Sequence, residues 1–192
     1  MDDEISNLYK GLRLIEEEQQ SVNISEEDVL VSKEKSRKCL IALVESKKDI
    51  NKGGFKATMA KVWKVEGSLI FKDVGKNKFL IEFKDPDEKH KVMQGRPWSF
   101  DRNLNLICLQ DCFGCLNLQD INFTLDPFWI QLHNLPFTGM NKKTGEKLVS
   151  TIGQVMLVDV DDQGMGCGQY MRVKVLVDTI KPFPRGRFLN KG

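Results

Sequence analysis

Cys112 and Cys115 have the two-residue spacing of a thiolate pair that binds zinc or cycles between thiol and disulfide. A structural zinc site needs about four convergent ligands, usually as two such pairs. Cys108 and Cys167 are the candidates to complete the set, and they do not form a second pair. A redox pair needs a helix that begins after its first cysteine, and residues 116–118 predict none. We therefore expect ordinary buried or loop thiols and no bound metal.

The histidines and a group of aspartates are the other candidates for catalysis or ion binding. Neither His90 nor His133 has a serine or cysteine nucleophile and a carboxylate partner close in the sequence. Asp159, Asp161 and Asp162 supply fewer oxygen ligands than a calcium loop needs, and they lack its spacing. These groups are expected to be structural or surface residues, and we predict that the protein is not an enzyme.

A glycine run imitates half of a dinucleotide-binding fingerprint, with Gly164, Gly166 and Gly168 at alternate positions. That fingerprint requires a helix N-terminus directly after the glycines, where backbone amides bind the pyrophosphate. Here a strand pattern follows from Tyr170. The run therefore predicts a mobile hairpin loop and no cofactor.

The charge is divided unevenly along the 192 residues, although the whole chain carries only +2. Residues 1–30 carry nine carboxylates and two basic side chains, a balance of −7, which leaves +9 on the rest. An acidic leader on a basic body is typical of a module that binds a polyanion and carries a regulatory tail. A leader that merely keeps the body soluble explains the same pattern.

The composition argues against a membrane or secreted protein. No apolar run approaches the roughly 18 residues that cross a bilayer. The N-terminus, Met-Asp-Asp-Glu, is acidic where a targeting signal is basic. Five cysteines, an odd count, indicate reduced thiols rather than a disulfide framework. We expect an intracellular protein of the nucleus or cytoplasm, without a signal peptide or a transmembrane segment.

The elements that must position these side chains begin with a continuous apolar run. Residues 39–44 predict a central strand that is buried on both faces. Phe55, Met59, Val62 and Trp63 then recur at helical spacing and predict one buried face. A 16-residue segment over 21–36 precedes the strand, and it is polar and charged around the short apolar patch Val29-Leu30-Val31. It predicts a linker or an edge element.

Two strands and a second helix complete the first half of the chain. Asp85 can cap free amides and Pro86 suits a first helical turn, so a helix is expected to start there and to end at Gly95. The predicted order is β-α-β-β-α-β, the ferredoxin-like order, with the later strands at 68–74, 78–84 and 104–109.

An aromatic pair follows the second helix. Pro97 prevents the helix from resuming. Trp98 and Phe100 are spaced by two, which turns both side chains to one face of an extended segment. We expect them to cover one side of the sheet.

A second, weaker round of the same pattern follows, with a helix capped by Asn141 and ended by Gly153. The order β-α-β-β of residues 39–83 then recurs over 128–177, either as a true repeat or as a habit of small α+β units. The expected elements are a strand at 128–132, a helix with Leu148, Val149 and Ile152 on its buried face, and strands at 154–160 and 170–177.

The fold class is therefore α+β, a ferredoxin-like core with a further βαββ extension. Four regions are expected: an acidic leader over 1–36, with an amphipathic helix formed by Ile5, Leu8, Leu12 and Ile15; the βαββαβ core over 37–110; the extension, packed on the core, over 111–180; and a basic tail with two prolines over 181–192.

Five short motifs occur in order along the chain: 79–83, 95–101, 128–132 with Leu135 and Pro136, 152–155, and 172–175 with Lys181 and Pro182. Over about residues 35–190 they closely resemble a plant domain of unknown function, DUF4283, that is found in LINE-type retrotransposon reading frames. The resemblance implies a divergent RNA-recognition-like fold, commonly followed by a Cys-Cys-His-Cys zinc knuckle, and no knuckle occurs before Gly192. It implies structural roles for Phe79, Phe83, Gly95, Pro97, Trp98, Phe100, Trp129, Pro136, Gly153 and Pro182.

RNA-recognition sheets stack bases on exposed aromatic side chains of their two central strands. The strand at 39–44 has no aromatic residue, and Phe79, Ile81 and Phe83 are expected in the core. Binding would then depend on phosphate contacts from basic side chains, with little base preference. The candidates are Lys76, Lys78, Arg172, Lys174, Lys181, Arg185 and Arg187, whose alternative role is a solvated basic surface.

Two functions from different classes fit the sequence. The first is a non-enzymatic, retrotransposon-derived module that binds single-stranded RNA or DNA mainly through phosphates and with low sequence specificity. The second is a protein-interaction or self-assembly module without nucleic-acid binding, whose basic body meets an acidic partner or its own leader. The family resemblance and the +9 body motivate the first, which we take as the leading hypothesis. The absent knuckle, the absent stacking aromatics and the leader helix support the second.

Overall fold

The computed structural model describes residues 25–101, 104–112 and 121–188. Its helices are α2 (Glu26–Arg37), α3 (Lys52–Val62), α4 (Pro86–Gln94) and α5 (Lys142–Val149), with a short 3-10 helix η1 (Phe137–Gly139). Its strands are β1 (Cys39–Val44), β2 (Leu69–Gly75), β3 (Lys78–Phe83), β4 (Trp98–Phe100), β5 (Asn105–Asp111), β6 (Leu125–His133), β7 (Gly153–Val158) and β8 (Tyr170–Asp178).

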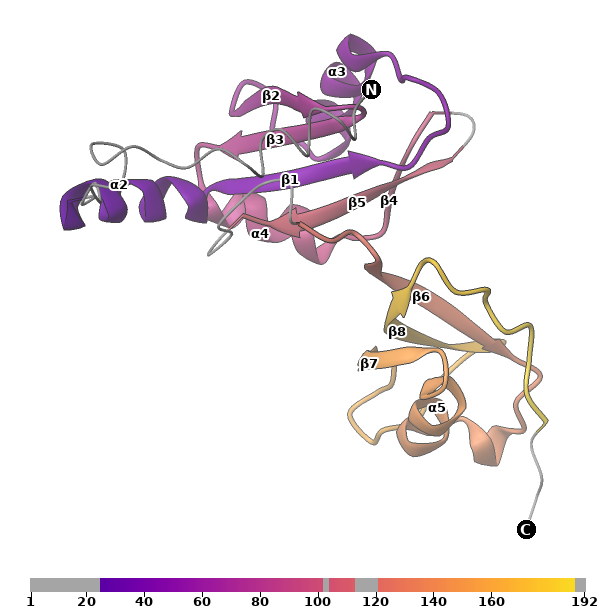
Figure 1. The fold of residues 1–192 in the computed structure, drawn as a ribbon. Helices are drawn as coiled ribbons and strands as arrows, with labels where there is room; N and C mark the ends of the chain where they lie inside the picture. Colours follow the sequence, from indigo (N-terminus) through magenta and orange to yellow (C-terminus); the bar gives the residue numbers. More distant parts are fainter. Residues whose placement is uncertain (1–24, 102–103, 113–120, 189–192) are drawn as a thin grey trace, which may run out of the picture. The chain divides into compact units, whose positions relative to one another are not determined.

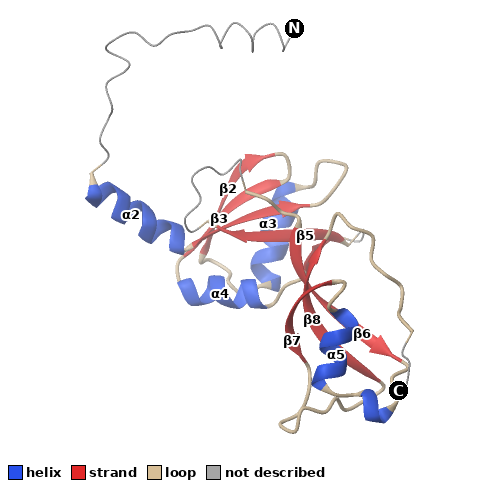
Figure 2. Cartoon of the chain, turned by 60° about the horizontal axis from the view of Figure 1, so that its bottom comes forward, coloured by secondary structure: helices blue, strands red, loops and turns tan. Residues whose placement is uncertain are grey.

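The strands form two antiparallel sheets, which we call the first sheet and the second sheet (Figure 1). The first sheet has the order β2-β3-β1-β5-β4, and the second has the order β6-β8-β7. Helices lie beside both sheets (Figure 2). The predicted α+β class is therefore confirmed, with β4 as a strand added to the expected β-α-β-β-α-β order.

The core of the first sheet lies between its strands and the helices α3 and α4. β1 is central, between β3 and β5, as its continuous apolar run predicted. Phe55 of α3 stacks on Phe79 of β3 with 4.7 Å between the ring centroids. Met59 and Trp63 are buried in the same cluster. Val62 was expected there and is exposed, because it lies about 60° around the helix from Met59, at the margin of the buried face.

Helix α2 occupies part of the segment that was expected to be a linker or an edge element, so that prediction is wrong. The Val29 amide donates to the Ser25 carbonyl at 3.2 Å, which closes the first turn. Leu30 and Val31 are exposed, so the helix has no apolar stripe that periodicity could detect. Its glutamates and lysines are strong helix formers. The amphipathic helix expected at residues 5–15 lies outside the described residues.

Helix α4 begins and ends as predicted. The Asp85 side chain accepts the Asp87 amide at 2.9 Å, and Pro86 occupies the first turn. The helix ends at Gly95, whose φ of −70° is an ordinary helical value. The left-handed conformation that often selects glycine at a helix end is therefore not the reason for glycine here.

The space around Gly95 gives the reason. A Cβ atom at this position would lie 2.5 Å from Cζ2 of Trp98. The Trp98 indole donates from Nε1 to the Val92 carbonyl at 2.8 Å, and it packs with Phe100 against the core of the first sheet. The aromatic pair of β4 thus covers the sheet as its spacing predicted.

The second sheet repeats the topology of residues 39–83. The order β6-α5-β7-β8 matches β1-α3-β2-β3, and in both cases the last strand lies between the other two and is antiparallel to each. Val149 of α5 joins the buried core. Gly153 was expected to end this helix, but α5 ends at Val149 and Gly153 begins β7. Glycine is needed there because a Cβ would collide with the Leu176 carbonyl.

Candidate nucleic-acid interface

The face of the first sheet that carries no helix is covered by the chain itself. Ile121 and Phe123 pack against Cys39 and Ile41 on this face. The Lys78 ammonium lies 5.4 Å from the centroid of the Phe123 ring. A base would stack on this face in an RNA-recognition sheet, and here the chain supplies its own aromatic ring.

The second sheet leaves its corresponding face open. Phe128, Ile130 and Leu132 of β6 turn towards the core below α5, so the alternate residues turn away from it. Those residues form three directly opposed pairs across β6 and β8, which we call the open face: Trp129 with Lys174, Gln131 with Arg172, and His133 with Tyr170.

Trp129 and two cations form one end of the open face. The indole is 37% exposed, with the Arg172 guanidinium carbon 5.0 Å and the Lys174 ammonium 5.7 Å from its ring centroid. Arg172 also binds Asp159, since its Nε and Nη2 lie 2.9 and 2.7 Å from one carboxylate oxygen. Both side chains are about half exposed, so this ion pair is only weakly stabilising. Another anion can therefore take the place of the Asp159 carboxylate beside Arg172.

A second aromatic pair forms the other end. The rings of His133 and Tyr170 are 5.1 Å apart at an angle of 44°. Gln131, which lies between the two ends, places Oε1 3.1 Å from Nε2 of His133. Sequence reasoning treated Trp129 as a structural residue. The alternation of Phe128, Ile130 and Leu132 with the polar Gln131 and His133 was the signal that Trp129 lies on the polar face.

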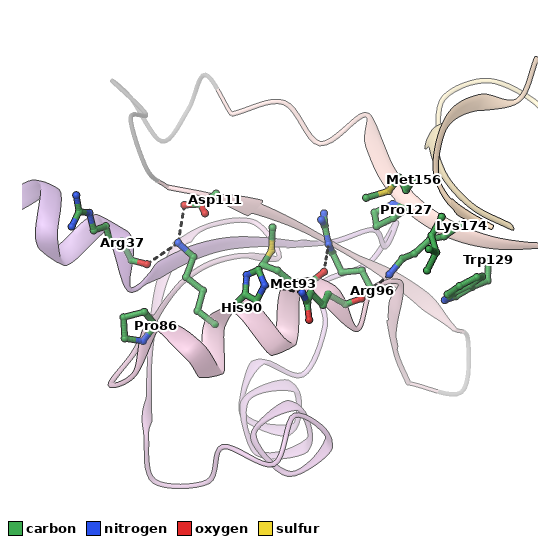
Figure 3. A pocket seen from close by; sticks show the side chains of 13 residues that line it. Arg37, Pro86, His90, Met93, Arg96, Asp111, Pro127, Trp129, Met156 and Lys174 are labelled. Carbon is green, nitrogen blue, oxygen red and sulfur yellow. Dashed lines mark hydrogen bonds and ion pairs between the residues drawn. The ribbon is translucent and has the colours of Figure 1, made fainter. Parts of the chain in front are cut away.

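A groove of about 710 Å³ adjoins the Trp129 end of the open face (Figure 3). Trp129 and Lys174 line it together with His90 and Met93 of α4. The Lys174 ammonium donates to the Gln94 carbonyl at 2.6 Å. Desolvation lowers the pKa of Lys174, and the charge of Arg96 lowers it further.

Arg96 and Asp126 form a buried ion pair beside this groove. The Arg96 Nη1 lies 3.4 Å from Asp126 Oδ1 and donates to the Leu109 carbonyl at 3.1 Å. Asp126 is fully buried, and its Oδ2 has no hydrogen-bond partner among the described residues. Burial raises the pKa of Asp126 to about 6, against the opposing charge of Arg96. Arg96 therefore compensates the negative charge of the Asp126 carboxylate only in part.

Lys89, a further cation of the groove, is committed to structure. It is buried, and its ammonium donates to Asp111 and to the Arg37 carbonyl at 2.8 Å each. Two short contacts to oxygen compensate its charge. Lys89 therefore supplies little free charge to a ligand.

The structure does not gather the seven predicted basic residues on one surface. Arg172 and Lys174 lie on the open face, while the others belong to the first sheet or to the tail. Lys78 meets Phe123, Lys76 lies 3.8 Å from Asp49, Lys181 lies 3.1 Å from Asp178, Arg187 donates to the carbonyls of Lys147 and Leu148, and Arg185 is exposed.

The family-motif residues divide between core and surface. Phe79 and Phe83 are fully buried, and Trp98 and Phe100 pack on the same cluster. Pro136 precedes η1 as its N-terminal cap residue, and Pro97 follows Arg96 in a cis peptide bond. Pro182 is exposed and Trp129 is partly exposed, so neither is a core residue.

Most of the cysteines in the described part of the chain are buried. Cys39, Cys108 and Cys112 are buried, while Cys167 is exposed. Burial raises the pKa of the Cys39 thiol and raises that of Cys108 to about 12, so neither is a thiolate at neutral pH. Cys115 lies outside the described residues. Within them, no three His, Cys, Asp or Glu side chains are grouped to hold a metal ion.

Comparison with protein families matches residues 32–110 to a domain of unknown function, DUF4283. The chain contains a DUF4283 domain. This domain comprises the first sheet with α3 and α4, and the match ends within β5, so the second sheet lies beyond it. A search of curated proteins found no match. None of the helices in the described ranges is long and apolar enough to cross a membrane.

Proposed function

We propose that this protein is a non-enzymatic module that binds single-stranded RNA or DNA through the open face of the second sheet. The observation that carries the proposal is the row of three opposed pairs, in which aromatic rings and cations share one face of β6 and β8. Two of the predicted phosphate-binding residues, Arg172 and Lys174, belong to this row.

The chemistry of the open face matches that of a single strand. Exposed aromatic rings stack on unpaired bases, which is worth about 1–3 kcal/mol per base. Arg172 and Lys174 are placed to neutralise backbone phosphates beside Trp129. Stacking and phosphate contacts accept every base, so we expect low sequence specificity.

The DUF4283 domain supports a retrotransposon origin through the resemblance described above, and a retrotransposon protein has single-stranded nucleic acid as an obvious ligand. We assign binding to the second sheet because the helix-free face of the first sheet is covered. With Phe123 against Cys39 and Ile41, the first sheet presents no free aromatic platform on β1 or β3.

The test is fluorescence anisotropy of labelled single-stranded RNA and DNA with the full chain, at low and at physiological salt. Trp129→Ala should weaken binding by about 1–3 kcal/mol. Lys174→Gln should reduce the dependence of log affinity on log salt by roughly one unit. The matched controls are Phe137→Ala, which removes an aromatic ring that is 77% exposed on η1, and Lys143→Gln on α5. Absence of binding at low salt, or equal effects of Trp129→Ala and Phe137→Ala, would refute the proposal.

Self-assembly is the second candidate function, and the edge strand β7 favours it. Met156 and Leu157 are about half exposed on this strand, which pairs on one side only. Unpaired edges with apolar side chains can add a strand from another chain. Light scattering after size exclusion should show a dimer that Leu157→Lys dissociates; a monomer at high concentration would exclude this function.

A further inference from the structure

The open face carries aromatic rings at two separate positions, and their spacing limits how a strand can lie on it. Trp129 and His133 are four residues apart on β6, which is about 13 Å along a strand. Tyr170 extends the second position across to β8, where it packs beside His133. We call Trp129 the first station and the His133–Tyr170 pair the second station.

Bases that are stacked in a regular strand are separated by about 3.4 Å. Two neighbouring bases therefore cannot occupy both stations while they remain stacked on each other. Between the stations lie Gln131 and Arg172, which are polar and offer no flat apolar surface. A nucleotide at this place meets a cation and an amide instead of a ring.

We infer that a single strand runs along β6 and β8 with two non-neighbouring bases stacked, one at each station, and with its intervening phosphates at Arg172. The inference rests on the proposed function and specifies its ligand as a segment of about three to five nucleotides, the number that spans about 13 Å in splayed or stacked form. A phosphate at Arg172 replaces Asp159, which holds the guanidinium in the free protein.

A face with two stations and a face with a single station predict different affinities for short oligonucleotides. A pentanucleotide reaches both stations, so it should lose about ten- to a hundredfold in affinity when either station is removed. A dinucleotide fills one station at a time, so removal of either station leaves the other available and should change affinity only about twofold. Removal of both stations should abolish dinucleotide binding.

The experiment is a titration of the full chain, followed by amide and indole NMR shifts, with di- and pentanucleotides of uridylate and of thymidylate. The first station is removed by Trp129→Ala and the second by His133→Ala with Tyr170→Ala. Trp129→Phe and Tyr170→Phe keep the rings and should retain the affinity of the wild type. Spectra of the free variants show that each remains folded.

Three outcomes would overturn the inference. If one variant alone abolished dinucleotide binding, the face would hold a single station. If the pentanucleotide bound no more tightly than the dinucleotide, the stations would act separately. If the wild type bound neither oligonucleotide, the proposed function itself would fail, and that result is distinct from the first two. The uridylate and thymidylate arms show whether RNA or DNA is the preferred strand.

Discussion

Replacement of Gly95 by alanine is expected to destabilise the first sheet, although alanine has a higher helix propensity than glycine. The new Cβ would lie 2.5 Å from Cζ2 of Trp98 and 3.2 and 3.3 Å from two further atoms of the same ring. Real Cβ atoms do not approach other carbon atoms this closely, so the indole must move. Its movement stretches the 2.8 Å bond from Nε1 to the Val92 carbonyl.

The magnitude follows from these two effects. Overpacking of a fitted site costs about 1–3 kcal/mol, and a lost hydrogen bond costs about 0.5–1.5 kcal/mol. Alanine also lowers the conformational entropy of the unfolded chain, which stabilises the folded protein by about 0.4–1 kcal/mol and offsets part of the loss. We therefore expect Gly95→Ala to lower the free energy of unfolding by about 0.5–4 kcal/mol, a large share of the roughly 5–15 kcal/mol by which a typical domain is stable.

Urea denaturation, followed by circular dichroism, measures this change. Gly53→Ala in α3 is the matched control, because its Cβ would meet only the Asn51 side chain at 3.6 Å, and alanine should stabilise that helix. Trp98→Phe removes the ring atoms that collide, so the double variant should recover part of the loss. Equal stability of Gly95→Ala and the wild type would show that the indole moves freely and that the reasoning is wrong.

Three further predictions concern single sites. Gly153→Ala should cost more than about 2 kcal/mol, because the new Cβ meets the backbone carbonyl of Leu176, which cannot rotate away; unchanged urea stability would contradict this. The pKa of Asp126 is raised from 3.8 to about 6, so its contribution to stability is present at low pH and is lost as pH rises through 6. Asp126→Asn should therefore gain about 2 kcal/mol relative to the wild type between pH 4 and pH 7, and a pH-independent difference in urea denaturation would refute it. Phe123→Ala should expose the Cys39 thiol and raise its rate of alkylation; an unchanged rate would show that Phe123 does not shield it.

Local signals in the sequence predicted much of the first sheet. The apolar run of β1, the capping carboxylate of Asp85 and the alternation of Trp98 and Phe100 each act over a few residues, and each was placed correctly. Helix α2 was missed because its stability does not depend on an apolar stripe, which is the signal that periodicity detects.

The candidate site was less accessible to sequence reasoning, for a different physical reason. Alternation along β6 indicates that Trp129 leaves the core, but it does not say which residues of β8 lie opposite. The register that places Lys174 beside Trp129 and Tyr170 beside His133 depends on pairing between segments about 40 residues apart. The cover over the first sheet likewise depends on a contact of Phe123 with Cys39, far away in the chain.

The two sheets use the same β-α-β-β topology, and the composition of the helix-free face explains why one is covered and the other is open. On the first sheet, this face presents Cys39 and Ile41, which are apolar and gain from burial under Phe123. On the second sheet, the three pairs of the open face hold an amide, two cations and aromatic rings with polar edges, all of which tolerate water. A face of this kind does not need a cover from its own chain, and it retains its stacking and charged groups for a ligand. Under the proposed function, the two sheets of the same topology have different roles: the first builds a closed core, and the second presents a surface for a ligand.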